Sequence, residues 1–217
     1  MRLDGAVNEF HDIFGFPDGP RGDRPEDLFE VSYQRDGQYL VNVARPQSGF
    51  GDMGVSLIYS LDKSWVQDLK VGSKLKVPTG NPSRLTGSGT HDIAFWLSAT
   101  NPLGNQFSHF LTLGGTLIEQ DRGLLSDMRN SGYGYLSYGV AWRYSPAIDL
   151  KIQLDTRSAI YKQTALLPLR SATTVSFGGV LRLSNNYMLE IAIAEDIAVG
   201  SAPDVVFQFN VTRNSSF

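Results

Sequence analysis

Three histidines are the side chains best suited to acid–base catalysis or metal binding, and they lie far apart in the sequence. His11 and His91 each precede an aspartate, and His109 follows Ser108. No two of them have the spacing of a metal-binding pair such as HExxH. Ser108 and His109 cannot form a hydrolase dyad, because neighbouring residues of one strand point to opposite faces. The sequence therefore predicts no enzyme, no metal site and no cofactor.

A second chemical feature is a set of charged or amide side chains in the middle of predicted strands. In the stretch 147–161, aliphatic residues from Ile148 to Leu154 alternate with charged and amide residues. A period of two indicates a strand with one apolar and one polar face. Charges are costly to bury alone, so charges of both signs on one face indicate ion pairs in contact with water. We predict that the following side chains face a polar lumen: Lys70, Lys74, Asp149, Lys151, Asp155, Arg182, Glu190 and Gln208.

Extended patterns of this kind occupy most of the chain and predict an all-β fold. Most of the segments approach the roughly 9–11 residues that a tilted strand needs to cross a bilayer. About eleven strands are expected, at residues 28–35, 38–44, 51–60, 66–77, 91–100, 106–118, 132–144, 147–161, 173–183, 187–197 and 205–212.

The connections between these segments alternate in length. Short turns such as Asp36-Gly37 and Asn185-Asn186 alternate with long polar loops after residues 77, 118 and 161. Short turns at one end and long loops at the other are typical of an antiparallel, up-and-down transmembrane β-barrel. A soluble sandwich has no reason to separate loop lengths in this way. Aromatic residues near strand ends are expected to form an interfacial girdle: Tyr59, Trp65, Tyr133, Tyr144, Tyr161 and Tyr187.

The beginning and the end of the sequence carry two further expectations. Residues 1–27 are predicted to form a short amphipathic helix, at 3–14, and an extracellular loop. Residues 28–217 are predicted to form a single domain of barrel strands. An odd strand count, an inward-running first strand and the missing signal peptide predict N-terminal truncation, with 12 or more strands in the full protein. Phe217 closes an alternating strand, which resembles the signal read by the outer-membrane assembly machinery.

The composition of the chain excludes some classes of binding partner. The formal net charge is -3 and the sequence pI is about 5.6, so no nucleic acid is expected, since nucleic acid binds a basic surface. The chain has no cysteine, which excludes disulfides and thiolate metal sites. The expected partner is the lipid bilayer.

Several short segments are similar to a known family. They are FHDIFGFP at 10–17, GFGD at 49–52, LKVPTG at 75–80 with LTGSG at 85–89 and Asp92, and PDVVF at 203–207. In these segments the chain resembles the later part of domain-of-unknown-function family 3187, an uncharacterised Gram-negative outer-membrane β-barrel family. The resemblance implies the cell outer membrane and a barrel, and it brings no reaction, ligand or catalytic residue.

We therefore interpret the sequence as an outer-membrane β-barrel with a structural or passive, pore-like transport role. The alternative is a soluble β-barrel or sandwich that acts as a binding module. A third hypothesis is a membrane-embedded lipid hydrolase, with a serine from another strand beside His109.

Overall fold

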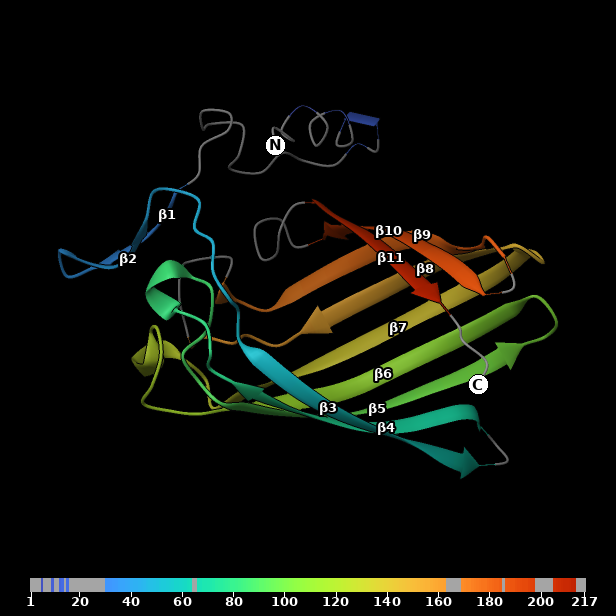
Figure 1. The fold of residues 1–217 in the computed structure, drawn as a ribbon, viewed down its shortest axis with the longest axis horizontal. Helices are drawn as coiled ribbons and strands as arrows, with labels where there is room; N and C mark the ends of the chain where they lie inside the picture. Colours follow the sequence, from blue (N-terminus) through green and yellow to red (C-terminus); the bar gives the residue numbers. More distant parts are fainter. Residues whose placement is uncertain are drawn as a thin grey trace.

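Nine strands form one antiparallel sheet in the computed structural model (Figure 1). The structure describes residues 30–63, 66–162, 169–184, 186–197 and 205–213, together with five isolated positions before residue 16. Spatial order follows chain order from β3 to β11, so every connection is up-and-down. The strands are β3 (Met53–Lys63), β4 (Val66–Val77), β5 (Asp92–Leu103), β6 (Phe107–Ile118), β7 (Gly132–Ser145), β8 (Ile148–Arg157), β9 (Ala172–Arg182), β10 (Tyr187–Asp196) and β11 (Val205–Arg213).

The first two strands stand apart from this sheet. β1 (Val31–Arg35) and β2 (Gln38–Val43) pair only with each other and form a hairpin. Asp36 and Gly37 both have positive φ, 50° and 78°, as a tight hairpin turn requires at its two central residues. The expected all-β antiparallel fold and its strands are confirmed. The expectation that the first two strands belong to the wall is wrong, because they pair with each other and not with a strand of the nine-stranded sheet.

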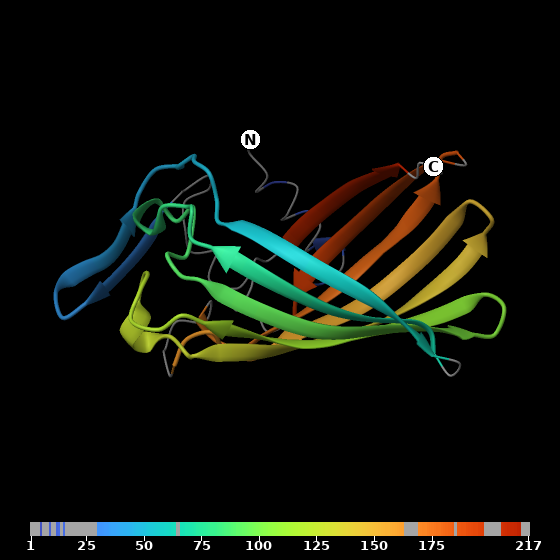
Figure 2. The same ribbon diagram turned by 60° about the horizontal axis from the view of Figure 1, so that its bottom comes forward.

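The sheet curves, so that one of its faces is concave (Figure 2). The strands are joined by short turns at one end and by long loops at the other, and the hairpin lies beside the long loops (Figure 1). The sheet does not close among the described residues: β3 and β11 are its two edges. A complete barrel is therefore not seen among the described residues.

Alternation along the strands separates apolar from polar side chains between the two faces. Leu150, Ile152 and Leu154 on the convex face are 43%, 48% and 45% exposed. Phe207 and Phe209 of β11 are also exposed. The buried hydrophobic side chains of the described residues are few: Val43, Val66, Leu69, Ile118, Ala172 and Ala194. The sheet thus presents its aliphatic face outward instead of packing it into a core.

Some expected features fall outside the described residues. These are the helix 3–14 (described only at isolated positions), Trp65, Asn185 and Phe217. No helix among the described residues has the length and apolar character needed to cross a membrane.

Candidate functional site

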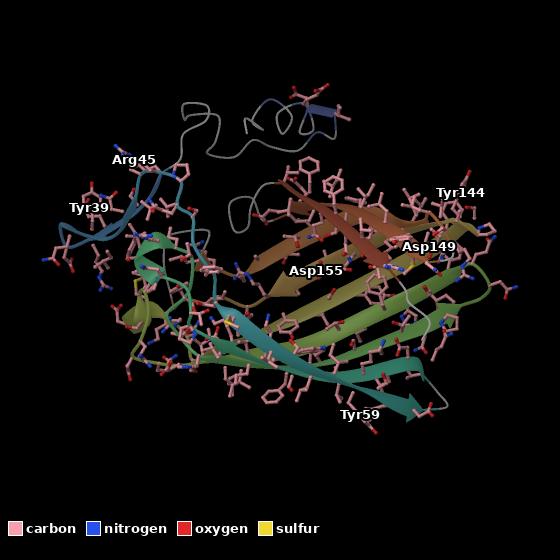
Figure 3. All side chains as sticks on the ribbon, viewed as in Figure 1. Tyr39, Arg45, Tyr59, Tyr144, Asp149 and Asp155 are labelled. Carbon is pink, nitrogen blue, oxygen red and sulfur yellow. The ribbon has the colours of Figure 1, made fainter. Side chains whose placement is uncertain are left out.

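The concave face of the sheet is the candidate site, because it gathers the polar side chains of six strands around one hollow. The hollow has a volume of about 570 Å³. Five of the eight predicted lumen residues line it: Asp149, Lys151, Asp155, Glu190 and Gln208. Figure 3 shows Asp149 and Asp155 within the curve of the sheet.

The other three predicted residues share this face by register. Lys70 is paired with Ser98, which lines the hollow. Lys74 lies four residues further along β4, so its side chain is on the same face. Arg182 lies two residues from Val180, which is paired with Asp149 and Glu190. Lys74 is exposed near the β3 edge, and its stem lies over Gly54. All eight residues therefore lie on one face of the sheet, although not around one point.

Ion pairs connect the charged residues of β8, β9 and β10. Lys151 Nζ lies 2.8 Å from Glu190 Oε1, and the pair crosses β9 where Gly178 is in register with Lys151. Arg182 Nη2 pairs with Asp149 Oδ2, and Arg143 Nε lies 3.7 Å from the other oxygen of the same carboxylate. These side chains are partly exposed, so they pair while still in contact with water.

Two further contacts complete the polar surface. Lys70 Nζ lies 2.6 Å from Asp68 Oδ2 on the same strand. The side-chain amide of Gln153 donates to both oxygens of Asp155 at 2.8 Å. In both contacts the two residues are two positions apart on one strand. Their side chains therefore lie next to each other on the same face of the sheet.

Sequence analysis missed the aromatic and hydroxyl residues of the concave face. Ser98, Thr112 and Ser137 lie in one cross-strand row. Trp96 precedes Ser98 by two residues, and Phe110 precedes Thr112 by two, so both rings lie on the same face. Their phase with the charged residues was the available signal, but neither Trp96 nor Phe110 was assigned to a face from the sequence.

The predicted girdle residues have different surroundings. Tyr59 and Tyr144 are exposed near the short-turn end (Figure 3), and Tyr187 is exposed under the Arg213 guanidinium, 5.8 Å from its ring centroid. Tyr161 lies in a loop and bridges Arg129. Tyr133 departs from this group: it is paired with Thr116 on the concave face, and its ring centroid is 6.4 Å from that of Tyr135. The girdle as a whole stays a prediction.

At the loop end, two of the segments that resemble the family meet in a partly buried polar cluster. Asp52 of GFGD accepts hydrogen bonds from the Gly80 and Ser88 N–H groups at 3.0 and 2.8 Å. Lys76 lies between Asp52, at 3.6 Å, and Asp92. Burial opposes ionisation, but the Ser88 and Gly80 N–H groups, the Ser88 hydroxyl and the Lys76 charge together hold the pKa of Asp52 below its usual range. This cluster fixes the loop after β4 to the chain before β3.

The histidines show no catalytic arrangement in the described part of the chain. His91 pairs with Glu119, Nδ1 to Oε2 at 2.9 Å, and hydrogen bonds from the His91 backbone and ring lower the pKa of Glu119 to about 2. His109 lies on the convex face beside the Tyr138 ring, centroids 6.0 Å apart, whereas Ser108 lines the hollow on the other face. Among the described residues there is no group of three or more potential metal ligands.

Comparisons with known proteins agree with this architecture. Residues 1–214 match the model of the family described as Protein of unknown function (DUF3187), so the chain belongs to that family. None of the curated proteins matches the chain. A solved structure, the COG4313 outer membrane channel from Pseudomonas putida F1, is similar with a TM-score of 0.58 and 18% identity. The match covers 74% of this chain and spans 64% of that channel's length, and it shows a shared fold.

Proposed function

We propose that this member of the DUF3187 family is a pore-like protein of the cell outer membrane, with a passive role and no catalysis. The observation that carries the proposal is the contrast between the two faces of one sheet. The convex face exposes aliphatic and aromatic side chains, and the concave face holds ion pairs around a hollow. Lipid outside and water inside satisfy both faces together.

The soluble alternative fits this contrast poorly. A soluble barrel or sandwich gains its stability by burying aliphatic faces in a dry interior. Here the hollow is polar, and large hydrophobic residues of every strand from β3 to β11 are exposed. In water, an exposed apolar surface of this kind would strongly favour aggregation.

The proposal requires partners for the two edges of the sheet. Unpaired backbone groups cannot remain in the hydrocarbon core, where no water replaces the missing hydrogen bonds. We therefore propose that β3 and β11 pair with further strands that complete the wall. The similar structure is an outer-membrane channel, which supports this completion. Recognition of the C-terminal strand by the assembly machinery is part of the same proposal.

Two measurements test this function. Extraction of membranes should leave the protein in the detergent-soluble fraction, and recovery in the aqueous fraction without detergent would end the membrane proposal. Reconstituted full-length protein should then give discrete conductance steps in a planar bilayer. Inserted, folded protein without conductance would contradict a pore and leave a structural envelope role.

A further inference from the structure

Three aromatic rings of the concave face each lie over a glycine of the neighbouring strand. In register, Trp96 faces Gly72, Tyr135 faces Gly114 and Phe110 faces Gly139. A Cβ atom added to these glycines would lie only 2.0, 2.5 and 2.3 Å from the nearest atom of the respective ring. Each ring therefore extends sideways along the wall, where the glycine leaves room for it, instead of projecting across the lumen. One face of each ring lies on the sheet and the other is turned to the lumen.

A row of polar side chains runs between these rings. The register connects Lys70, Ser98, Thr112, Ser137, Asp155 and Thr174 from β4 to β9. Trp96 and Tyr135 belong to the adjacent row on one side, and Phe110 belongs to the adjacent row on the other side. Four of these residues, Ser98, Thr112, Ser137 and Thr174, carry hydroxyl groups, which both donate and accept hydrogen bonds without a charge.

Eight charged side chains of this face form four ion pairs. Lys70 pairs with Asp68, Lys76 with Asp92, Lys151 with Glu190 and Arg182 with Asp149. A pore selects ions through rings of charge of one sign. The described part of the concave face instead alternates both signs at ion-pair distance, which favours neutral solutes.

We propose that the concave face carries a binding track for neutral carbohydrates, formed by Trp96, Phe110 and Tyr135 with the hydroxyl row between them. A sugar ring has an apolar face of C–H groups and an edge of hydroxyl groups. The C–H face stacks on the exposed ring faces, and the hydroxyl groups exchange their hydrogen bonds with water for bonds to Ser98, Thr112 and Asp155. This inference rests on the proposed pore function and specifies its solute class.

The test is the block of ion current through the full-length protein in a planar bilayer by maltotriose, a neutral glucose trimer. Maltotriose should reduce the current in a saturable manner, and Trp96→Ala should raise the half-blocking concentration about two- to tenfold. Trp96→Phe should retain the block, because it keeps an aromatic face. Phe95→Ala is the matched control: this neighbouring residue lies on the convex face, so its loss should leave the block unchanged.

Each outcome decides between the two proposals. No conductance from inserted wild-type protein overturns both of them. Conductance with no saturable block, or with an equal block by a polyethylene glycol of the same size, overturns the carbohydrate track and leaves the pore. If Trp96→Ala fails to insert, Phe110→Ala provides the same measurement on the other side of the hydroxyl row. A block that neither variant weakens overturns the track.

Discussion

The convex and concave faces are built from alternate residues of the same strands, yet they follow opposite rules. On the convex face, large apolar side chains stay exposed and make few polar contacts. On the concave face, carboxylates and cations pair, and aromatic rings lie over glycines. The backbone ladder is the same for both. Under the proposed function, this difference teaches that the strand pattern encodes two solvents, lipid on the convex face and water on the concave face.

The largest expected difference comes from placing a charge on each face at neighbouring positions of β8. Ile152→Arg puts a guanidinium into the apolar belt and should lower the free energy of unfolding in lipid vesicles by about 2–4 kcal/mol. Gln153→Arg, one residue on, points into the hollow and should be tolerated. Urea unfolding of both variants in the same vesicles measures the difference. Equal losses for the two variants would remove the distinction between the faces.

Glycines of the two faces should also respond differently to alanine. Gly72→Ala places a Cβ 2.0 Å from the Trp96 ring, so the ring must move, at a cost of about 1–3 kcal/mol. At Gly134, on the convex face, the nearest atom is 3.8 Å away. Gly134→Ala should leave stability unchanged or raise it by about 0.5–1 kcal/mol, because alanine restricts the unfolded chain. A destabilised Gly134→Ala together with a neutral Gly72→Ala would reverse the assignment.

The ion pair between β8 and β10 should contribute less. Both side chains are about a third or more exposed, so solvent screening limits the Lys151–Glu190 pair to about 1 kcal/mol or less. A double-mutant cycle with Lys151→Met and Glu190→Gln, followed by unfolding, isolates this coupling. We expect a stabilising coupling free energy that becomes smaller as salt is added, because the pair is in contact with water. Exactly additive single effects would show that the two groups do not interact.

The smallest effect concerns the loop end, where acid should act without disturbing the wall. The pKa of Glu119 is about 2, below its ordinary 4.5, so its stabilising contribution is complete above pH 4.5 and is lost as the pH falls through about 2. Amide hydrogen exchange in the loops at 78–91 and 119–131 should therefore increase in that window, while the β6–β8 ladder stays protected. Glu119→Gln is the control and should reduce the pH dependence, because the part that remains comes from Asp52, whose pKa is also lowered and which holds Gly80 and Ser88. Equal loosening of the ladder would indicate general acid unfolding instead.

Much of the fold was predictable from local pattern. Period-two alternation and turn pairs such as Asp36-Gly37 are properties of neighbouring residues, and all eleven expected strands are present. The expected strand 147–161 ends at Arg157, because the backbone that follows soon binds the loop at 128–130: Asn130 N–H donates to the Ile160 carbonyl and Lys162 N–H to the Met128 carbonyl. Such long-range pairings have no local signature.

The position of the first hairpin could not be predicted for the same reason. It is held by Arg35 Nη1 to Asp127 Oδ2 at 2.6 Å and by the Tyr33 hydroxyl, which donates to Met128 Sδ at 3.3 Å. These partners lie more than 90 residues apart, and no repeated pattern links them.

For the candidate site, the position of each charged residue in the strand alternation predicted which face it lies on. The type of an aromatic residue did not predict its face. Every charged residue assigned to the lumen lies on one face because the alternation is uninterrupted through these positions of β4, β8, β9 and β10. Tyr133 was assigned to the girdle because aromatic residues are common at membrane interfaces, and Trp96 was not assigned to a face. Phase with the charged residues places both on the concave face.

The most direct test of the two-solvent account uses the absence of cysteine, because every single-cysteine variant is then free of background. Cysteine is introduced in turn at residues 150 to 155, and the protein is reconstituted into lipid vesicles that are treated with a charged, membrane-impermeant maleimide. The account predicts labelling at 151, 153 and 155 and protection at 150, 152 and 154. Uniform labelling, or labelling with the opposite alternation, would contradict it.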